Sequence, residues 1–370
     1  MKKKLFSILI VILLCIPMIY SQEDESLIQM AILLDTSNSM DGLIDQAKSQ
    51  LWKIVNELAL SKKNGKSPKI EVALFEYGND SLPQNIGYIR MVSPLTTDLD
   101  LISDKLFKLT TNGGDEYCGY VIKDAIEMLK WTNNNKILKV IFIAGNEPFN
   151  QGNVDYKKSC KDAIAKGVIV NTIFCGPAQE GINSFWKNGA DLADGKYINI
   201  DQSVQYTYVE APQDKEIEAL NSELNKTYVS YGIEGKEKKD MQERQDSNAG
   251  AMNQEAKIQR SVTKSQKQYS NSSWDLVDAV KDNVVDIDKI KDEDLPPEMK
   301  KMDKKARKEY VEKLTKKRME IQEKITKLNK ERTDYLNNLK KQNNKEDTLD
   351  TAIIKSIKEQ ATKKDYKFNP

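Results

Sequence analysis

Residues 28–40 read IQMAILLDTSNSM, and this stretch decides the fold. Residues 28–34 are almost entirely apolar and end at Asp35, which is typical of a short strand buried on both faces of a sheet. Similar runs recur at 70–77 (IEVALFEY), 88–92, 137–144 (ILKVIFIA), 168–174 (VIVNTIF) and 197–200. Apolar residues at helical spacing lie between these runs, over 43–60, 98–109, 121–129, 156–166 and 182–193. This alternation predicts an α/β fold over residues 26–201, with a doubly wound and mostly parallel sheet.

The polar residues directly after the first strand have a spacing that suits a metal ion. Asp35, Ser37 and Ser39 alternate in the sequence DTSNS, so their oxygens can converge on one point. The carboxyl edge of a parallel sheet is the usual ligand crevice of such folds. Carboxylate and hydroxyl oxygens suit a hard cation such as Mg²⁺. We therefore expect Asp35, Ser37 and Ser39 to hold a divalent cation.

The D-x-S-x-S motif in this strand context resembles the metal site of the von Willebrand factor type A family. The resemblance covers about residues 26–201. It implies a metal-ion-dependent adhesion site that holds Mg²⁺ (or Mn²⁺ or Ca²⁺) and takes two further ligands from two later loops. It also implies that an acidic side chain of a protein partner fills the last position on the cation.

The two later loops depart from the pattern of the family. The first reads TTNGGDE over 110–116, and Asp115 stands where a threonine commonly follows the glycine pair. We expect Asp115 to be a ligand, with Thr111 as the alternative. In the second loop, Gly145 stands where the family carries an aspartate, so Asn146 is the expected neutral ligand and Glu147 its alternative. The competing interpretation is a degenerate site with a purely structural loop.

The composition excludes several kinds of catalysis. The chain has 370 residues, a formal charge of +1 and no histidine. Ser-His-Asp and Cys-His nucleophiles, an imidazole base and His-ligated zinc are therefore ruled out. No acid–base pair or nucleophile accompanies the expected cation site, so we do not expect an enzyme.

The first 21 residues are typical of an export signal. Three lysines (2–4) precede an apolar run over 5–20, and a small residue, Ser21, stands at a plausible cleavage position. An uncleaved anchor is the alternative, although the run is short for a membrane span. The chain is thus expected in the periplasm, at the cell surface or in the medium.

Export places three cysteines in a compartment that permits disulfides. Cys118, Cys160 and Cys175 lie outside the signal, and an odd number allows at most one intramolecular pair. Cys160–Cys175 is favoured slightly as a staple across a short loop, and Cys118–Cys175 is the alternative.

The remaining chain is highly charged and reads as helical. We expect a linker and helical segment over 202–297, a coiled-coil helix over 298–345 and a flexible tail over 346–370. The heptad seam of the coiled coil comprises Val311, Leu314, Arg318, Ile321, Ile325, Leu328, Arg332, Tyr335 and Leu339. Arginines in a seam disfavour a symmetric homodimer, so we expect this helix to pack on its own chain or on a different protein.

Two functions are consistent with this pattern. The first is an exported binding or adhesion protein whose cation completes its coordination with an acidic residue of a protein partner. The second is a structural protein of the cell envelope, with a metal-free scaffold and an assembling coiled coil. The lysine-rich helix could also contact an anionic polymer or membrane surface, but solvated helix faces are the simpler explanation, and nucleic-acid binding is not expected.

Overall fold

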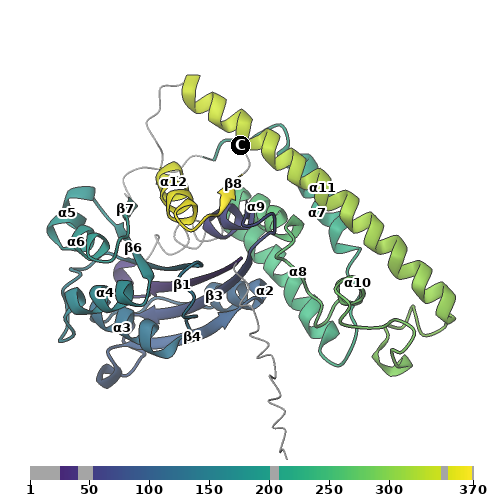
Figure 1. Cartoon of the computed structure of the whole chain (residues 1–370), viewed down its shortest axis with the longest axis horizontal. Coiled ribbons are helices and arrows are strands. Elements are labelled where there is room, and N and C mark those ends of the chain that lie inside the picture. Colours follow the sequence, from purple (N-terminus) through teal and green to yellow (C-terminus); the bar gives the residue numbers. More distant parts are fainter. Residues whose placement is uncertain (1–25, 41–52, 201–207, 343–348, 369–370) are drawn as a thin grey trace, which may run out of the picture.

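The computed structural model describes residues 26–40, 53–200, 208–342 and 349–368. Its centre is a six-stranded sheet in the order β4-β3-β1-β5-β6-β7 (Figure 1). The strands are β1 (Leu27–Asp35), β3 (Lys69–Tyr77), β4 (Ile89–Thr96), β5 (Leu138–Gly145), β6 (Val168–Cys175) and β7 (Tyr197–Ile200). Neighbouring strands are parallel except for β3 and β4, which are antiparallel. The predicted doubly wound, mostly parallel α/β sheet is confirmed.

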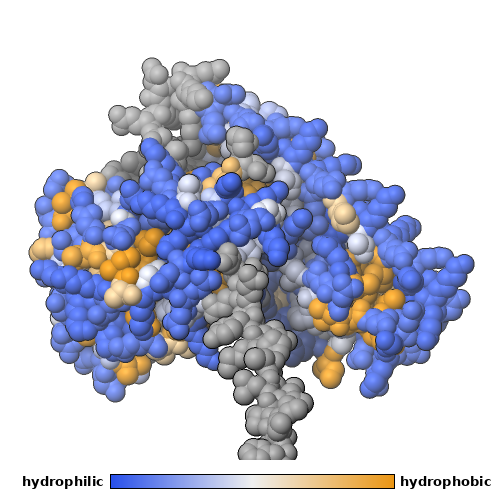
Figure 2. Space-filling view, viewed as in Figure 1, coloured by the Kyte–Doolittle hydropathy of each residue, from blue (hydrophilic) through white to orange (hydrophobic). Residues whose placement is uncertain are grey.

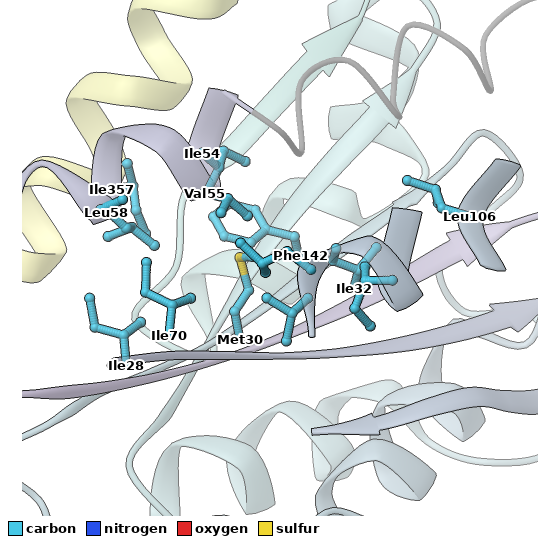
Figure 3. Packing of buried hydrophobic residues seen from close by; sticks show 14 of the residues in the cluster. Ile28, Met30, Ile32, Ile54, Val55, Leu58, Ile70, Leu106, Phe142 and Ile357 are labelled. Carbon is cyan, nitrogen blue, oxygen red and sulfur yellow. The ribbon is translucent and has the colours of Figure 1, made fainter. Parts of the chain in front are cut away.

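Two separate cores lie on the two faces of the sheet, because successive strand residues point to opposite faces. Along β1, Met30 faces one core and Ala31 the other. The first core is covered by helical residues 53–59, α2 (Leu99–Phe107) and α12 (Leu349–Thr362), and Figure 3 shows Leu58 and Ile357 reaching toward the strands. The second core is covered by α3 (Cys118–Met128), α4 (Tyr156–Ala165) and α6 (Trp186–Asp191), with α5 (Ala178–Asn183) just before α6. Most of the helix expected over 43–60, and the expected export signal, lie outside the described residues.

The segment beyond the sheet forms helices, two of which contact α2. They are α7 (Asp214–Asn225), α8 (Gly235–Met252), α9 (Gln254–Ser265), α10 (Leu276–Lys281) and α11 (Lys304–Gln342). Ser103 of α2 donates a hydrogen bond of 3.0 Å to Gln245 of α8, and Asp100 of α2 forms a buried ion pair of 2.5 Å with Arg260 of α9. Buried polar contacts of this kind hold these helices against the sheet-bearing part. Breaking one would leave a charge or a hydrogen-bond donor buried without its partner.

The long helix α11 packs along α7, α9 and α10 and crosses Figure 1 as a straight rod. Its heptad-spaced arginines are buried, and each has an acidic partner on another helix of this chain or just before it. Arg318 bonds Asp275 at 2.5 Å and Asp278 at 2.8 Å, and its guanidinium lies 4.1 Å from the ring centroid of Tyr228. Arg332 bonds Asp214 at 2.7 Å. The charge of each seam arginine is therefore balanced within the chain.

The expectation of a flexible tail over 346–370 is wrong for residues 349–368. These residues form α12 and the short strand β8 (Lys367–Phe368), which pairs with β2 (Ser61–Lys62). The Tyr366 hydroxyl donates to the Leu27 carbonyl at 2.6 Å, and Gln360 exchanges two buried hydrogen bonds with Asn171 of β6. The physical reason is that Ile357, Ala361 and Tyr366 complete the first core, which outweighs the many charges nearby.

The expected disulfide between Cys160 and Cys175 does not form. All three cysteines outside the signal are buried free thiols. Cys175 belongs to the first core, whereas Cys160 on α4 belongs to the second, so the sheet separates the two sulfurs. Cys118 lies in the second core as well, which excludes its pairing with Cys175 for the same reason.

We predict three free thiols in protein that starts at residue 22 and is unfolded without reductant. A thiol reagent should react slowly with the folded protein, because burial raises the pKa of Cys160 to about 12 and that of Cys175 further. Titration in denaturant checks the count. A single free thiol would contradict the structure and would indicate a bond between Cys118 and Cys160, which share a core.

The surface is mainly hydrophilic, with an apolar patch over α10 in the view of Figure 2. Exposed apolar side chains near this helix include Val284 and Ile233, which are 60% and 100% exposed. None of the helices in the described ranges combines the length and the apolarity that a bilayer crossing requires.

Candidate metal centre

The candidate centre lies at the carboxyl edge of β1, where neighbouring loops meet. Asp35 is the last residue of β1 and pairs in register with Tyr77, the last residue of β3. The backbone N–H of Thr36 donates to the Tyr77 carbonyl at 2.9 Å, and the N–H of Asn112 donates to the Thr36 carbonyl at 3.0 Å. The loop after β1 is thereby held between the loop after β3 and the loop before α3.

The three residues of the D-x-S-x-S motif converge as expected. The Ser37 N–H donates to Asp35 Oδ1 at 2.7 Å, and the hydroxyls of Ser37 and Ser39 are 2.7 Å apart. A short helical turn, η1 (Asn38–Met40), places Ser39 at the rim. Ser39 Oγ donates to Asn146 Oδ1 at 2.9 Å, so the structure also brings Asn146 into the cluster.

The second carboxylate in the cluster belongs to Glu116, which the sequence analysis did not select. Glu116 is buried, and its Oε1 accepts from Ser39 Oγ at 3.3 Å. Its Oε2 accepts from the N–H of Glu147 at 3.3 Å, which links the loops before α3 and after β5. The signal that could have identified Glu116 is its place two residues before α3, where a carboxylate can turn inward beside the end of β1.

Asp115 and Thr111, the residues expected from this loop, lie differently. Asp115 is exposed and accepts a hydrogen bond of 3.0 Å from the Tyr117 hydroxyl. Thr111 is half-buried. The Asp115 carboxylate therefore pairs with Tyr117 and not with the cluster of Asp35, Ser37 and Ser39.

Comparison with known proteins identifies the sheet-bearing part. The sequence model of the von Willebrand factor type A domain matches residues 29–187. These residues are a von Willebrand factor type A (VWA) domain. No curated protein sequence matches the chain.

Several solved structures resemble the VWA domain. BatB from Bacteroides thetaiotaomicron is 19% identical, with a TM-score of 0.35, and the match covers 47% of this chain and 90% of that one. The VWA domain of SpRpn10 is 17% identical, with a TM-score of 0.37 and coverage of 48% and 90%. Proximal thread matrix protein 1 from the mussel byssus, described with a zinc-occupied metal-ion-dependent adhesion site, is 15% identical, with a TM-score of 0.32 and coverage of 46% and 41%.

At Gly145, where the resemblance implies an aspartate, the structure leaves no room for a side chain. A Cβ atom at Gly145 would lie 2.5 Å from the Tyr77 hydroxyl and 3.0 Å from the Trp186 ring. Both side chains are fully buried, and the Tyr77 hydroxyl donates to the Ala144 carbonyl at 2.9 Å. The space of an aspartate side chain is thus filled from β3 and α6.

The VWA domain carries an electrostatic imbalance that a cation would relieve. Burial raises the pKa of Asp35 well above its usual value, and the hydrogen bond and charge of Glu116 raise it further. Asp35 Oδ2 is buried and has no hydrogen-bond partner. The described residues hold no group of three or more His, Cys, Asp or Glu side chains suited to a metal, so the donors here are two carboxylates, two hydroxyls and an amide. This all-oxygen set fits a hard divalent cation.

Proposed function

We propose that the VWA domain binds a divalent cation and, through it, an acidic side chain of a protein partner. Asp35, Ser37 and Ser39 would hold the cation, with Glu116 as the second carboxylate and Asn146 as a neutral ligand. The bound cation supplies positive charge that attracts a carboxylate. Mg²⁺ is the first choice, with Mn²⁺ and Ca²⁺ as alternatives.

The observation that carries this proposal is the unpartnered Oδ2 of Asp35. A buried carboxylate oxygen without a donor costs about 1–3 kcal/mol or more, so such a group calls for an explanation. Glu116 restores the carboxylate that the domain lacks at Gly145, because it reaches the same cluster from the loop before α3.

The proposed activity is binding and not catalysis. The chain contains no histidine, and the thiol of Cys118 is buried, with a pKa raised well above its usual value by desolvation first. A thiol of this kind is a poor nucleophile. The expected export signal over 1–21 would place this partner in the periplasm, at the cell surface or in the medium.

Two adjacent residues provide a matched test of the ligand set. Glu116→Gln should weaken the affinity for Mg²⁺ or Mn²⁺ by at least about tenfold, because it removes a carboxylate charge from the centre. Asp115→Asn removes the same charge one residue away and should change the affinity by less than about twofold, because exposed charges are screened. Calorimetric titration measures both affinities, and each variant is checked for an unchanged fold by circular dichroism.

Thermal unfolding provides the second measurement. The wild-type protein should gain about 2.7 kcal/mol of stability at a cation concentration of 100 times Kd. A melting temperature unaffected by millimolar cation would contradict the cation site and favour the metal-free scaffold. Equal losses in Glu116→Gln and Asp115→Asn would contradict the assignment of Glu116.

A further inference from the structure

The edge of the sheet that carries the centre is acidic throughout. Five segments form this edge, namely residues 35–40, 78–88, 109–117, 146–155 and 176–185, and the structure describes all of them. They contain the carboxylates of Asp35, Asp80, Asp115, Glu116, Glu147, Asp155 and Glu180. None of the residues in these five segments is lysine or arginine.

Several lysines close to these segments are each engaged by an acid of their own helix. Lys123 bonds Glu127 at 2.7 Å, Lys158 bonds Asp162 at 2.5 Å, and Lys187 bonds Asp191 at 2.6 Å. Each acidic partner lies one helical turn further from the edge, so the ion pair holds the lysine ammonium group away from the edge. These three ammonium groups are therefore drawn away from the edge, and its negative charge is offset only in part, by Lys157 over the ring of Tyr156.

One flank of the centre combines two of these carboxylates with two tyrosines. Tyr117 donates to Asp115, and its ring lies 6.0 Å from that of Tyr88, centroid to centroid. The pKa of Tyr88 is raised by desolvation first and then by the charges of Asp115 and Asp80. A Cβ atom on Gly113 would lie 3.5 Å from Asn38 Nδ2 and 3.6 Å from Asp80 Oδ2, so the flank adjoins the D-x-S-x-S loop.

A divalent cation would offset only part of this charge. Its two positive charges match those of Asp35 and Glu116, whereas five carboxylates are not matched by the cation, namely Asp80, Asp115, Glu147, Asp155 and Glu180. A partner that offered only acidic residues would meet a repulsive field around the very cation it must reach. Basic side chains beside the acidic residue would turn this repulsion into attraction. The buried, unpartnered Asp35 Oδ2 independently marks the same edge as a ligand site.

We propose that the partner presents its acidic residue within a basic protein segment. A Lys or Arg next to that residue docks on the flank formed by Asp80, Tyr88, Asp115 and Tyr117. Carboxylates attract the cationic head there, and the tyrosine rings favour it through cation–π contacts. This inference rests on the proposed function, because the acidic residue of the partner binds through the cation.

Labelled hexapeptides test the charge requirement with the full chain at saturating Mg²⁺. The probes are Gly-Lys-Lys-Asp-Lys-Gly, its neutral analogue Gly-Ser-Ser-Asp-Ser-Gly, and Gly-Lys-Lys-Asn-Lys-Gly, which lacks the acid. Fluorescence polarisation should show the Lys/Asp peptide binding at least about tenfold more tightly than either of the others. This preference should shrink as the salt concentration rises.

Two double variants with the same change in charge locate the effect. Asp80→Asn with Asp115→Asn should reduce the preference for the Lys/Asp peptide over the neutral peptide to below about threefold. Asp240→Asn with Asp334→Asn should leave it intact, since these exposed acids lie on α8 and α11, away from the flank. The Mg²⁺ affinity of every variant is measured separately.

The outcomes separate this inference from the function on which it rests. Absence of Mg²⁺ binding in the wild-type protein would overturn the proposed function itself. Mg²⁺ binding with no preference for the Lys/Asp peptide, or with no peptide binding, would overturn the inference alone. Equal loss of preference in both double variants would also overturn it, because the effect would then come from net charge and not from the flank.

Discussion

Replacing Arg318 with alanine should destabilise the protein by about 3–5 kcal/mol, because it leaves two buried carboxylates without their counterion. Arg318 is only 2% exposed and bonds Asp275 at 2.5 Å and Asp278 at 2.8 Å. It also donates to the Thr227 hydroxyl at 3.0 Å. All of these contacts join α11 to residues before it, so the loss falls on the docking of the long helix. Urea denaturation followed by circular dichroism measures the change.

The neighbouring residue is the control for this prediction. Lys317 is exposed and bonds Glu223 at 2.8 Å, with side chains that are 44% and 41% exposed. Lys317→Ala should change the stability by no more than about 0.5–1 kcal/mol, as is usual for surface ion pairs. Trypsin adds a local measurement, since undocked α11 would expose its many lysines to cleavage. Similar stabilities and similar cleavage rates for the two variants would refute the role of Arg318.

Gly145→Ala should cost about 1–3 kcal/mol, because the new methyl group overlaps the Tyr77 hydroxyl and presses on Trp186 in a closely packed region. The same substitution in a Tyr77→Phe background should cost less than about 1 kcal/mol, since the hydroxyl is gone. A double-mutant cycle measured by thermal or urea unfolding reports the coupling between the two positions.

Another glycine of the same chain serves as the reference. Gly250 lies in α8, and a Cβ atom there would meet only Lys257 Cδ, at 3.9 Å. Gly250→Ala should therefore be neutral or stabilising by up to about 1 kcal/mol, since alanine favours helix. If Gly145→Ala proved as harmless as Gly250→Ala, the steric account of the missing aspartate would be wrong.

The sheet could be predicted because each of its strands is encoded by a short, continuous stretch of sequence. Each strand is a short apolar run, and Asp35, Ser37 and Ser39 occupy one loop whose geometry follows from alternation alone. The position of Glu116 could not be predicted in the same way. Two adjacent acids follow the glycine pair, and which of them turns inward depends on the start of α3 and on the N–H of Glu147 from another loop.

The errors elsewhere arise from contacts between distant segments. Gly145 is required by Tyr77, which lies on β3, two strands away in the sheet. Cys160 and Cys175 are close in sequence, but α4 covers the face of β6 opposite to the one that Cys175 occupies. The partners of Arg318 lie 40 and 43 residues earlier, so the heptad seam revealed a buried stripe without revealing what covers it.

The hydrogen bond between Tyr366 and Leu27 also constrains the order in which the chain can fold. It joins residues 339 positions apart, and α12 closes the first core over a sheet whose first strand was synthesised long before. Chains are synthesised at roughly 5–20 residues per second, so tens of seconds pass between the synthesis of β1 and that of α12. Contacts of such long range also slow folding, because the chain loses the entropy of closing a large loop before the contact can stabilise it. Until the last helix arrives, the part of the first core that α12 covers stays open to chaperones.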